Sequence, residues 1–261
     1  MTRQAFTIAH YTLLEALRNR LVWLFVLAAL LAAGLGALLE QLALTESWQT
    51  ALALMAPALR LAGVALLAAF VVTSQVRESA DKGLELLLAL PLPRSAYVLG
   101  KLAGYATLAL LPALLYGALC WAWSAGAGQS LSQCLLWTLS LWCELCLVAG
   151  FALLAVLGLG QALPALATSA GFYLLARSIG AMQLLSHGAA GLHSGPLQRV
   201  LGSGVDLVAA LLPPLDRYTR TDWLLYHSGD TGALWLVLGQ SAVYVLLLGC
   251  AALVDLYRKA L

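Results

Sequence analysis

Three charged residues lie inside long apolar runs of the sequence and are the first candidates for a functional site. They are Arg60, Glu144 and Arg177. A charge within a membrane is costly and marks a functional position by default. Counted from the ends of their apolar runs, all three are expected between the midplane and the outer leaflet. They are candidates for a substrate path or for structural pairing of Glu144 with one arginine, and the spare positive charge suits an anionic substrate or a lipid headgroup.

Cysteine and histidine residues offer a weaker candidate, a metal site. Cys143 and Cys146 form a Cys-x-x-Cys pattern beside Glu144, and soft thiolates can bind copper(I). Cysteines three positions apart on a membrane helix more often pack as small residues, so no metal is predicted. The spacing of the remaining candidates, His187, His193 and His227, matches no metal-binding template.

The sequence carries no signature of an enzyme. A phosphate-binding Gly-x-x-x-x-Gly-Lys-Ser/Thr stretch is missing, because Gly100 and Lys101 are followed by Leu102. Neither a Gly-x-Ser-x-Gly elbow nor a His-Glu-x-x-His pair is present. We therefore expect no catalytic residue and no cofactor in this chain. A membrane-embedded enzyme acting on lipids remains an alternative that an operon of lipid genes would favour.

Composition places these residues in an integral membrane protein. Of the 261 residues, 62% are hydrophobic and 10% are charged, against roughly 25% charged in soluble domains. The apolar runs are continuous rather than alternating, which favours helices over a barrel. The predicted fold is an all-α membrane domain over residues 1–261, in contact with lipids and without a nucleic-acid partner.

Six membrane-spanning helices are predicted, after an amphipathic interfacial helix over residues 1–20. The spans are expected at 21–39, 51–74, 98–123, 134–157, 165–182 and 232–254. Residues 183–231 form a long outer segment in which we expect a partly embedded helical hairpin that ends at Pro213 and Pro214. Nine basic residues on the side of the termini against three on the other place both termini in the cytoplasm.

The longest charged stretch, over residues 75–101, lies between the second and third predicted spans. Its first half is expected to be a short amphipathic helix, with Glu78 and Lys82 in the favourable order for an ion pair. Pro91 and Pro93 are expected to end that helix. Mixed charges next to a leucine-rich face indicate a cytoplasmic surface that docks onto a partner.

This order of elements resembles the membrane subunit of an ABC-2-type ATP-binding cassette transporter. The resemblance is closest between Glu78 and Lys101, and it includes a Gly-x-Glu-x-Leu-Leu stretch from Gly83, a Pro-x-x-Arg turn and a Gly-Lys re-entry at Gly100. The opening LLEALRNRLVWLFVL and the outer stretch LLPPLDRY are also similar to the family.

The resemblance implies a bacterial inner-membrane permease subunit that moves a substrate outward. A separate ATPase subunit would bind ATP and magnesium and dock on the N-terminal helix and the loop over residues 75–97. The implied coupling residues are Glu78, Asp81, Lys82, Gly83, Glu85, Pro91 and Arg94. A second permease copy would complete the transporter, most simply as a homodimer.

One alternative within this class remains open at the sequence level. The chain would then transmit ATPase-driven force to a periplasmic partner, with residues 183–231 as the contact. An adjacent ATPase gene would support both interpretations, the exporter subunit and the force-transmitting subunit. The sequence does not identify the substrate, because substrate cavities in such proteins are lined by ordinary apolar residues.

Overall fold

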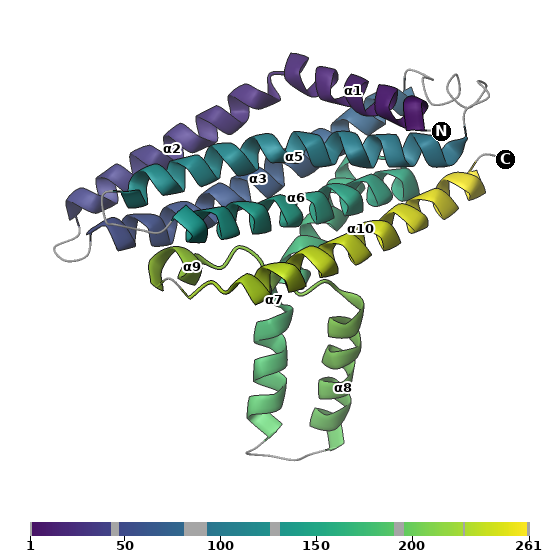
Figure 1. Ribbon diagram of the computed structural model, residues 1–261. Helices are drawn as coiled ribbons and strands as arrows, with labels where there is room; N and C mark the ends of the chain where they lie inside the picture. The colour runs from purple at the N-terminus through teal and green to yellow at the C-terminus, as the bar shows by residue number, and fades with distance from the viewer. Residues whose placement is uncertain are drawn as a thin grey trace.

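The computed structural model describes residues 2–42, 47–80, 93–125, 131–190, 196–226 and 228–259, and these residues are almost entirely helical (Figure 1). Long apolar runs form helices because a helix satisfies its own backbone hydrogen bonds. The helices are α1 (Thr2–Arg18), α2 (Leu21–Leu42), α3 (Ser47–Ala80), α5 (Arg94–Ala125), α6 (Leu131–Leu159), α7 (Ala162–Ala190), α8 (Pro196–Leu211), η1 (Leu215–Arg217), α9 (Thr221–Tyr226) and α10 (Thr231–Lys259).

Five helices of the described part are long and apolar enough to cross a membrane. They lie at Leu21–Leu42, Trp48–Ala80, Arg94–Ser124, Leu131–Leu159 and Gly232–Arg258. The sixth expected span, at 165–182, falls within α7, which is long enough but is not among the five. Small and polar residues such as Thr168, Ser169 and Gly171, together with Arg177, dilute its apolar character. An all-α membrane protein is confirmed, but six spans are not.

Helix α6 is the centre of the bundle. It packs against α3, α5, α7, α9 and α10, and it has the largest buried share among the five candidate spans. Trp137, Leu141 and Leu145 are fully buried along it. Glu144, which lies on α6 and is fully buried, is consequently surrounded by protein.

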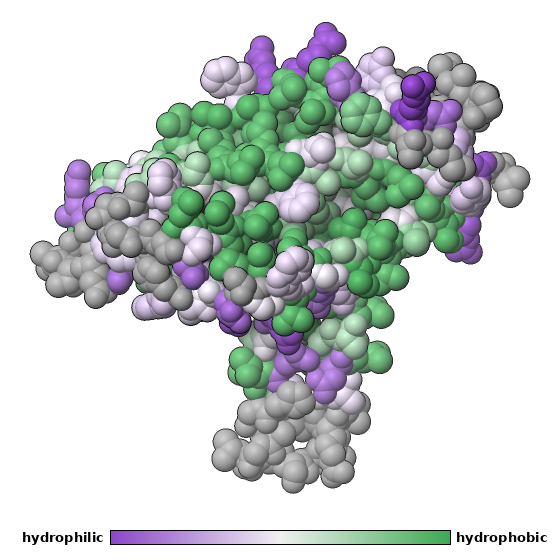
Figure 2. All heavy atoms as spheres, viewed as in Figure 1, coloured by the Kyte–Doolittle hydropathy of each residue, from purple (hydrophilic) through white to green (hydrophobic). Residues whose placement is uncertain are grey.

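The surface of the bundle is mainly apolar between its two ends. Figure 2 shows hydrophobic side chains over the viewed face, and hydrophilic ones near the chain termini, at the opposite end and where α7 and α8 leave the bundle. Exposed leucines on α2, such as Leu30, Leu31 and Leu35, belong to this apolar surface. The pattern is that of a bundle surrounded by acyl chains and flanked by two polar zones.

Helix α1, in the region of the expected interfacial helix, packs along the first half of α5. Two glycines four residues apart on α5 permit this close contact. A Cβ at Gly100 would lie 2.8 Å from the Ala5 carbonyl oxygen, and a Cβ at Gly104 would lie 2.9 Å from the Thr12 Cβ. Small residues at this spacing let two helix backbones approach each other.

The variant Gly104→Leu is therefore expected to separate α1 from α5. The added side chain would meet the Ala9 backbone, which lies 3.2 Å from where its Cβ would stand, and overpacking of this kind costs about 1–3 kcal/mol. Limited proteolysis should cleave α1 faster in the variant than in the native chain. Gly34→Leu is the matched control, since a Cβ there has nothing within 4 Å; equal cleavage of both variants would contradict the packing argument.

The charged stretch differs from its prediction at its first residues. Residues 75–80 are the end of α3, which is continuous from Ser47 to Ala80, and do not begin a separate helix. Helix propagation past residue 74 costs little because each added residue contributes one hydrogen bond. Helix α5 begins at Arg94, directly after Pro93. Residues 81–92, which hold the rest of the predicted coupling helix, lie outside the described residues.

Helices α7 and α8 form a hairpin that extends from the bundle (Figure 1). Its helices are linked by a hydrogen bond from Gln183 to Asp206 at 3.4 Å. Exposed leucines occur on both helices, at Leu184, Leu185, Leu207 and Leu211. After α8 the chain turns at Pro213 and Pro214 into η1, so the segment 212–220 returns to the bundle.

Candidate functional site

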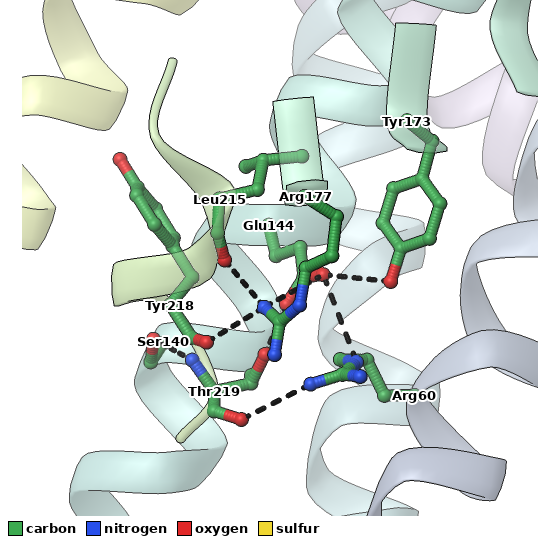
Figure 3. A network of polar contacts seen from close by, with 8 residues as sticks. All are labelled: Arg60, Ser140, Glu144, Tyr173, Arg177, Leu215, Tyr218 and Thr219. Carbon is green, nitrogen blue, oxygen red and sulfur yellow. Dashed lines mark hydrogen bonds and ion pairs between the residues drawn. The ribbon is translucent and has the colours of Figure 1, made fainter. Parts of the chain in front are cut away.

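The three charged residues predicted from the sequence meet in the bundle interior (Figure 3). Glu144 on α6 is fully buried. Its Oε1 atom lies 4.0 Å from Arg60 Nε on α3 and 3.8 Å from Arg177 Nη1 on α7. The structure thus pairs Glu144 with both arginines rather than with one.

Two hydroxyl groups also donate hydrogen bonds to the Glu144 carboxylate. The Tyr173 hydroxyl on α7 donates a hydrogen bond to Oε1 at 3.0 Å, and the Thr219 hydroxyl donates one to Oε2. Both carboxylate oxygens are therefore hydrogen-bonded. Hydroxyl donors and guanidinium groups thus surround the buried carboxylate on both of its oxygen atoms.

The arginines also bind the backbone of the segment that follows α8. Arg177 Nη1 donates to the carbonyl oxygens of Leu215 and Tyr218, the second at 2.9 Å. Arg60 Nη1 donates to the carbonyl oxygen of Thr219 at 3.3 Å. Three carbonyl groups of a segment outside the long helices are satisfied in this way.

These hydrogen bonds satisfy buried backbone groups of residues 215–219. Backbone that is buried inside a bundle but is not part of a regular helix leaves peptide groups without partners, unless neighbouring groups supply the hydrogen bonds. Leu215, Tyr218 and Thr219 are all fully buried, and Thr219 has a φ of 44°, in the left-handed region. The Thr219 amide donates to Ser140 Oγ at 2.9 Å. The network therefore holds residues 215–219 against α3, α6 and α7.

The spare positive charge expected from the sequence is partly offset in the structure. Asp216 is a second carboxylate on the same segment, and it packs directly against Gly180 of α7, one helical turn from Arg177. Two carboxylates therefore lie close to the two arginines, which favours a structural network over an open anion site.

Several members of this network were not identified from the sequence. Tyr173, Ser140 and Thr219 are ordinary residues in or beside apolar runs, and the carbonyl groups of Leu215 and Tyr218 have no side-chain signal at all. The only sequence signal was the stretch LLPPLDRY, through its similarity to a family segment. Burial also raises the pKa of the Tyr218 phenol above its ordinary value, so it stays protonated and donates to the Val237 carbonyl oxygen.

A second polar cluster joins α1, α3 and α5 near the chain termini. Glu78 and Lys101 form an ion pair at 2.6 Å, with side-chain exposures of 20% and 5%. The Ser74 hydroxyl donates to Glu15 Oε1 at 2.7 Å. Residues just before and just after the segment 81–92 are consequently tied together.

The other predicted coupling residues are placed only in part. The Arg94 guanidinium lies 4.9 Å from the centre of the Tyr257 ring on α10, a cation–π contact. Glu78 contacts Lys101, while its predicted partner Lys82 lies outside the described residues. So do the remaining members of the predicted coupling set: Asp81, Gly83, Glu85 and Pro91.

The described residues do not support a metal site. Cys143 and Cys146 are unpaired thiols on α6, the first buried and the second partly buried. No group of three or more His, Cys, Asp or Glu side chains in the described part is arranged to hold a metal.

An apolar cavity of about 310 Å³ adjoins the Glu144 network. It lies between α3, α6 and α7, and Tyr173 belongs to both the cavity and the network. The other residues that line it are Leu61, Val64, Ala65, Ala68, Val148, Leu166, Ser169, Ala170 and Leu174. Such a cavity suits an apolar group and does not select among apolar ligands.

Comparison with known proteins identifies one family. A family model described as ABC-2 family transporter protein matches residues 16–176 of the chain. The matched region contains α2, α3, α5 and α6, together with residues 81–92. It also includes α7 as far as Ala176, the residue before Arg177. No curated protein sequence matches the chain.

Proposed function

The chain belongs to the ABC-2 family of transporter proteins, and from this membership we propose that it is the permease subunit of an ATP-driven exporter. A separate ATPase subunit binds ATP and magnesium, and the chain converts nucleotide-driven closure into movement of its helices. Two copies of the chain pair with two ATPase subunits in the bacterial inner membrane. The substrate moves outward.

The proposed topology has six spans, with α7 as the fifth. Two observations support it: α7 is 29 residues long, roughly 44 Å at 1.5 Å per residue, and the chain termini lie at the same end of the bundle in Figure 1. Five crossings would leave the termini on opposite sides. Small residues and Arg177 are tolerated in α7 because its charged side faces α6 and the segment 215–219.

The observation that carries the coupling proposal is the ion pair between the buried Lys101 and the partly buried Glu78. It joins the end of α3 to the start of α5 on either side of residues 81–92, and α1 packs on the same part of α5. A partner that pushes on this loop therefore moves α1, α3 and α5 together. We call this set, defined by Glu15, Ser74, Glu78, Gly100 and Lys101, the coupling unit.

Charge reversal within the loop is expected to abolish ATPase binding. The test is co-purification of the tagged chain with the ATPase encoded nearest to it, using Asp81→Arg combined with Glu85→Arg. We expect at least a tenfold loss of bound ATPase, since like charges placed at an interface cost several kcal/mol. Glu78 is left unchanged because its reversal would break the internal pair with Lys101.

The matched control reverses two acidic residues at the other end of the bundle. Glu40 and Asp222 are both exposed, so Glu40→Arg combined with Asp222→Arg makes the same change of net charge. This control should retain the ATPase. Retention by the loop variant as well would remove residues 81–92 from the interface, and loss by the control as well would mean a general effect of charge.

A second candidate function follows from the α7–α8 hairpin. Its extension from the bundle and its exposed leucines suit a contact through which ATPase-driven force passes to a periplasmic partner. Replacement of Leu184 and Leu207 by serine distinguishes the two functions. A force-transmitting subunit would lose its partner, whereas an exporter would keep its transport-linked ATP hydrolysis.

A further inference from the structure

A pocket of about 330 Å³ lies between η1, α9 and the start of α10. It opens at the protein surface, next to the segment that the Glu144 network holds. This volume is within the range of ligand pockets, roughly 300–1,000 Å³. Its walls combine cationic, polar and apolar residues: Arg217, Arg220, Trp223, Ser228, Asp230, Ala233, Leu236, Val237 and Gln240. This pocket is distinct from the Glu144 site and from the apolar cavity beside Tyr173.

The two arginines are the unusual feature of this pocket. Arg217 and Arg220 are exposed, and within the described part of the chain neither guanidinium group forms a salt bridge. Asp230 is the nearby acid, but it directly precedes α10, which begins at Thr231, where a carboxylate favours the helix N-terminus. The pocket thus offers two guanidinium groups to an anion.

The short segment that carries these arginines is fixed by its opposite face. Tyr218 and Thr219 face inward and are held by Arg177 and Arg60, while Arg217 and Arg220 face outward. The pocket arginines are therefore presented from a positioned backbone rather than from a free loop. Two guanidinium groups carried by a positioned backbone are well suited to a phosphate group.

The remaining walls indicate what carries the anion. Leu236 is 74% exposed, and Trp235 next to it is 73% exposed, so α10 continues the pocket as an apolar surface along the bundle. Trp223 lines the pocket and is itself buried. Aromatic rings and arginines at one level are typical of the membrane interface. An anion with an attached apolar tail fits this surface better than a free ion does.

We propose that this pocket binds the phosphate headgroup of an anionic phospholipid, with Arg217 and Arg220 on the phosphate and the acyl chain along α10. The site does not depend on substrate export. In the proposed orientation of the chain, this pocket would face the outer leaflet. A bound headgroup would add a negative charge on the outward-facing side of residues 215–219. The inward-facing side of that segment is held by the Glu144 network.

The test is a titration of the purified chain with dioctanoyl phosphatidylglycerol, read by native mass spectrometry. Arg217→Gln combined with Arg220→Gln is expected to weaken binding by about tenfold or more, and phosphatidylcholine should bind weakly to both forms. Arg3→Gln combined with Arg18→Gln, two exposed residues of α1, makes the same charge change and should bind the lipid like the native chain.

A second variant makes the test independent of the arginines. Ala233→Glu places a carboxylate in the pocket wall and should remove the preference for phosphatidylglycerol over phosphatidylcholine. Excess inorganic phosphate should not displace the lipid. The proposal is overturned by equal binding of both lipids, by unchanged binding in the glutamine and glutamate variants, or by displacement with inorganic phosphate, which would assign the pocket to a free anion.

Discussion

The variant Glu144→Ala is expected to lose about 3–5 kcal/mol of folding stability, because removal of one partner leaves buried charges uncompensated. Arg60 and Arg177 would remain in the bundle interior without the carboxylate that lies within 4.0 Å of both. Tyr173 and Thr219 would each lose a hydrogen-bond acceptor. Thermal unfolding of the detergent-solubilised chain measures the effect.

Ser140→Ala is the matched control for Glu144→Ala. It removes one buried hydrogen bond to the same segment, the bond from the Thr219 amide, and should cost about 1 kcal/mol. A double-mutant cycle between Glu144→Ala and Arg60→Ala should show coupling, since the two residues share one network. Equal losses for Glu144→Ala and Ser140→Ala, with no coupling, would mean that the charges contribute nothing.

The variant Lys101→Met is expected to uncouple ATP hydrolysis from the chain. Glu78 would remain partly buried without its cation, at a cost of roughly 3 kcal/mol, and the end of α3 would separate from α5. The ATPase should still bind through residues 81–92. Its rate of ATP hydrolysis should then no longer respond to the presence of the chain in lipid nanodiscs.

The double variant Glu78→Gln with Lys101→Met separates charge loss from loss of contact. It removes both charges, and most of the stability should return because no unpaired charge remains. Glu40→Gln changes an exposed residue near the end of α2, away from the loop and from α1, and should leave ATP hydrolysis and stability unchanged. Normal coupling in Lys101→Met would contradict the role given to the ion pair.

The charged members of the Glu144 network could be predicted from the sequence, whereas most of their hydrogen-bond partners could not. Charges stand out in an apolar run, so Arg60, Glu144 and Arg177 could be identified from the sequence. The carbonyl groups of Leu215 and Tyr218 could not, because hydrogen bonding of the backbone by a distant arginine leaves no mark on the local sequence. Only the return of the segment after Pro214 brings these groups to α3 and α7.

The coupling stretch illustrates a different limit. Local spacing predicted that Glu78 pairs with Lys82, which lies outside the described residues. The structure also brings Glu78 into contact with Lys101, 23 positions later. Local spacing could not predict this contact, because it depends on how α3 and α5 pack together. The close approach of α1 to Gly100 and Gly104 was also not predicted, since it depends on which helix faces α5.

The number of spans was harder to predict than their type. Strongly apolar runs, such as the one in α2, indicate a span by composition alone. Helix α7 contains Thr168, Ser169 and Arg177 and depends on neighbouring helices to cover its polar side. Composition within one helix therefore leaves the sixth crossing a proposal, supported by the positions of the two termini.

Native mass spectrometry of the tagged chain, purified with the ATPase encoded nearest to it, tests the assignment as a permease subunit. We expect a complex of two 27.5 kDa chains and two ATPase subunits. A folded chain that carries no ATPase would contradict that assignment.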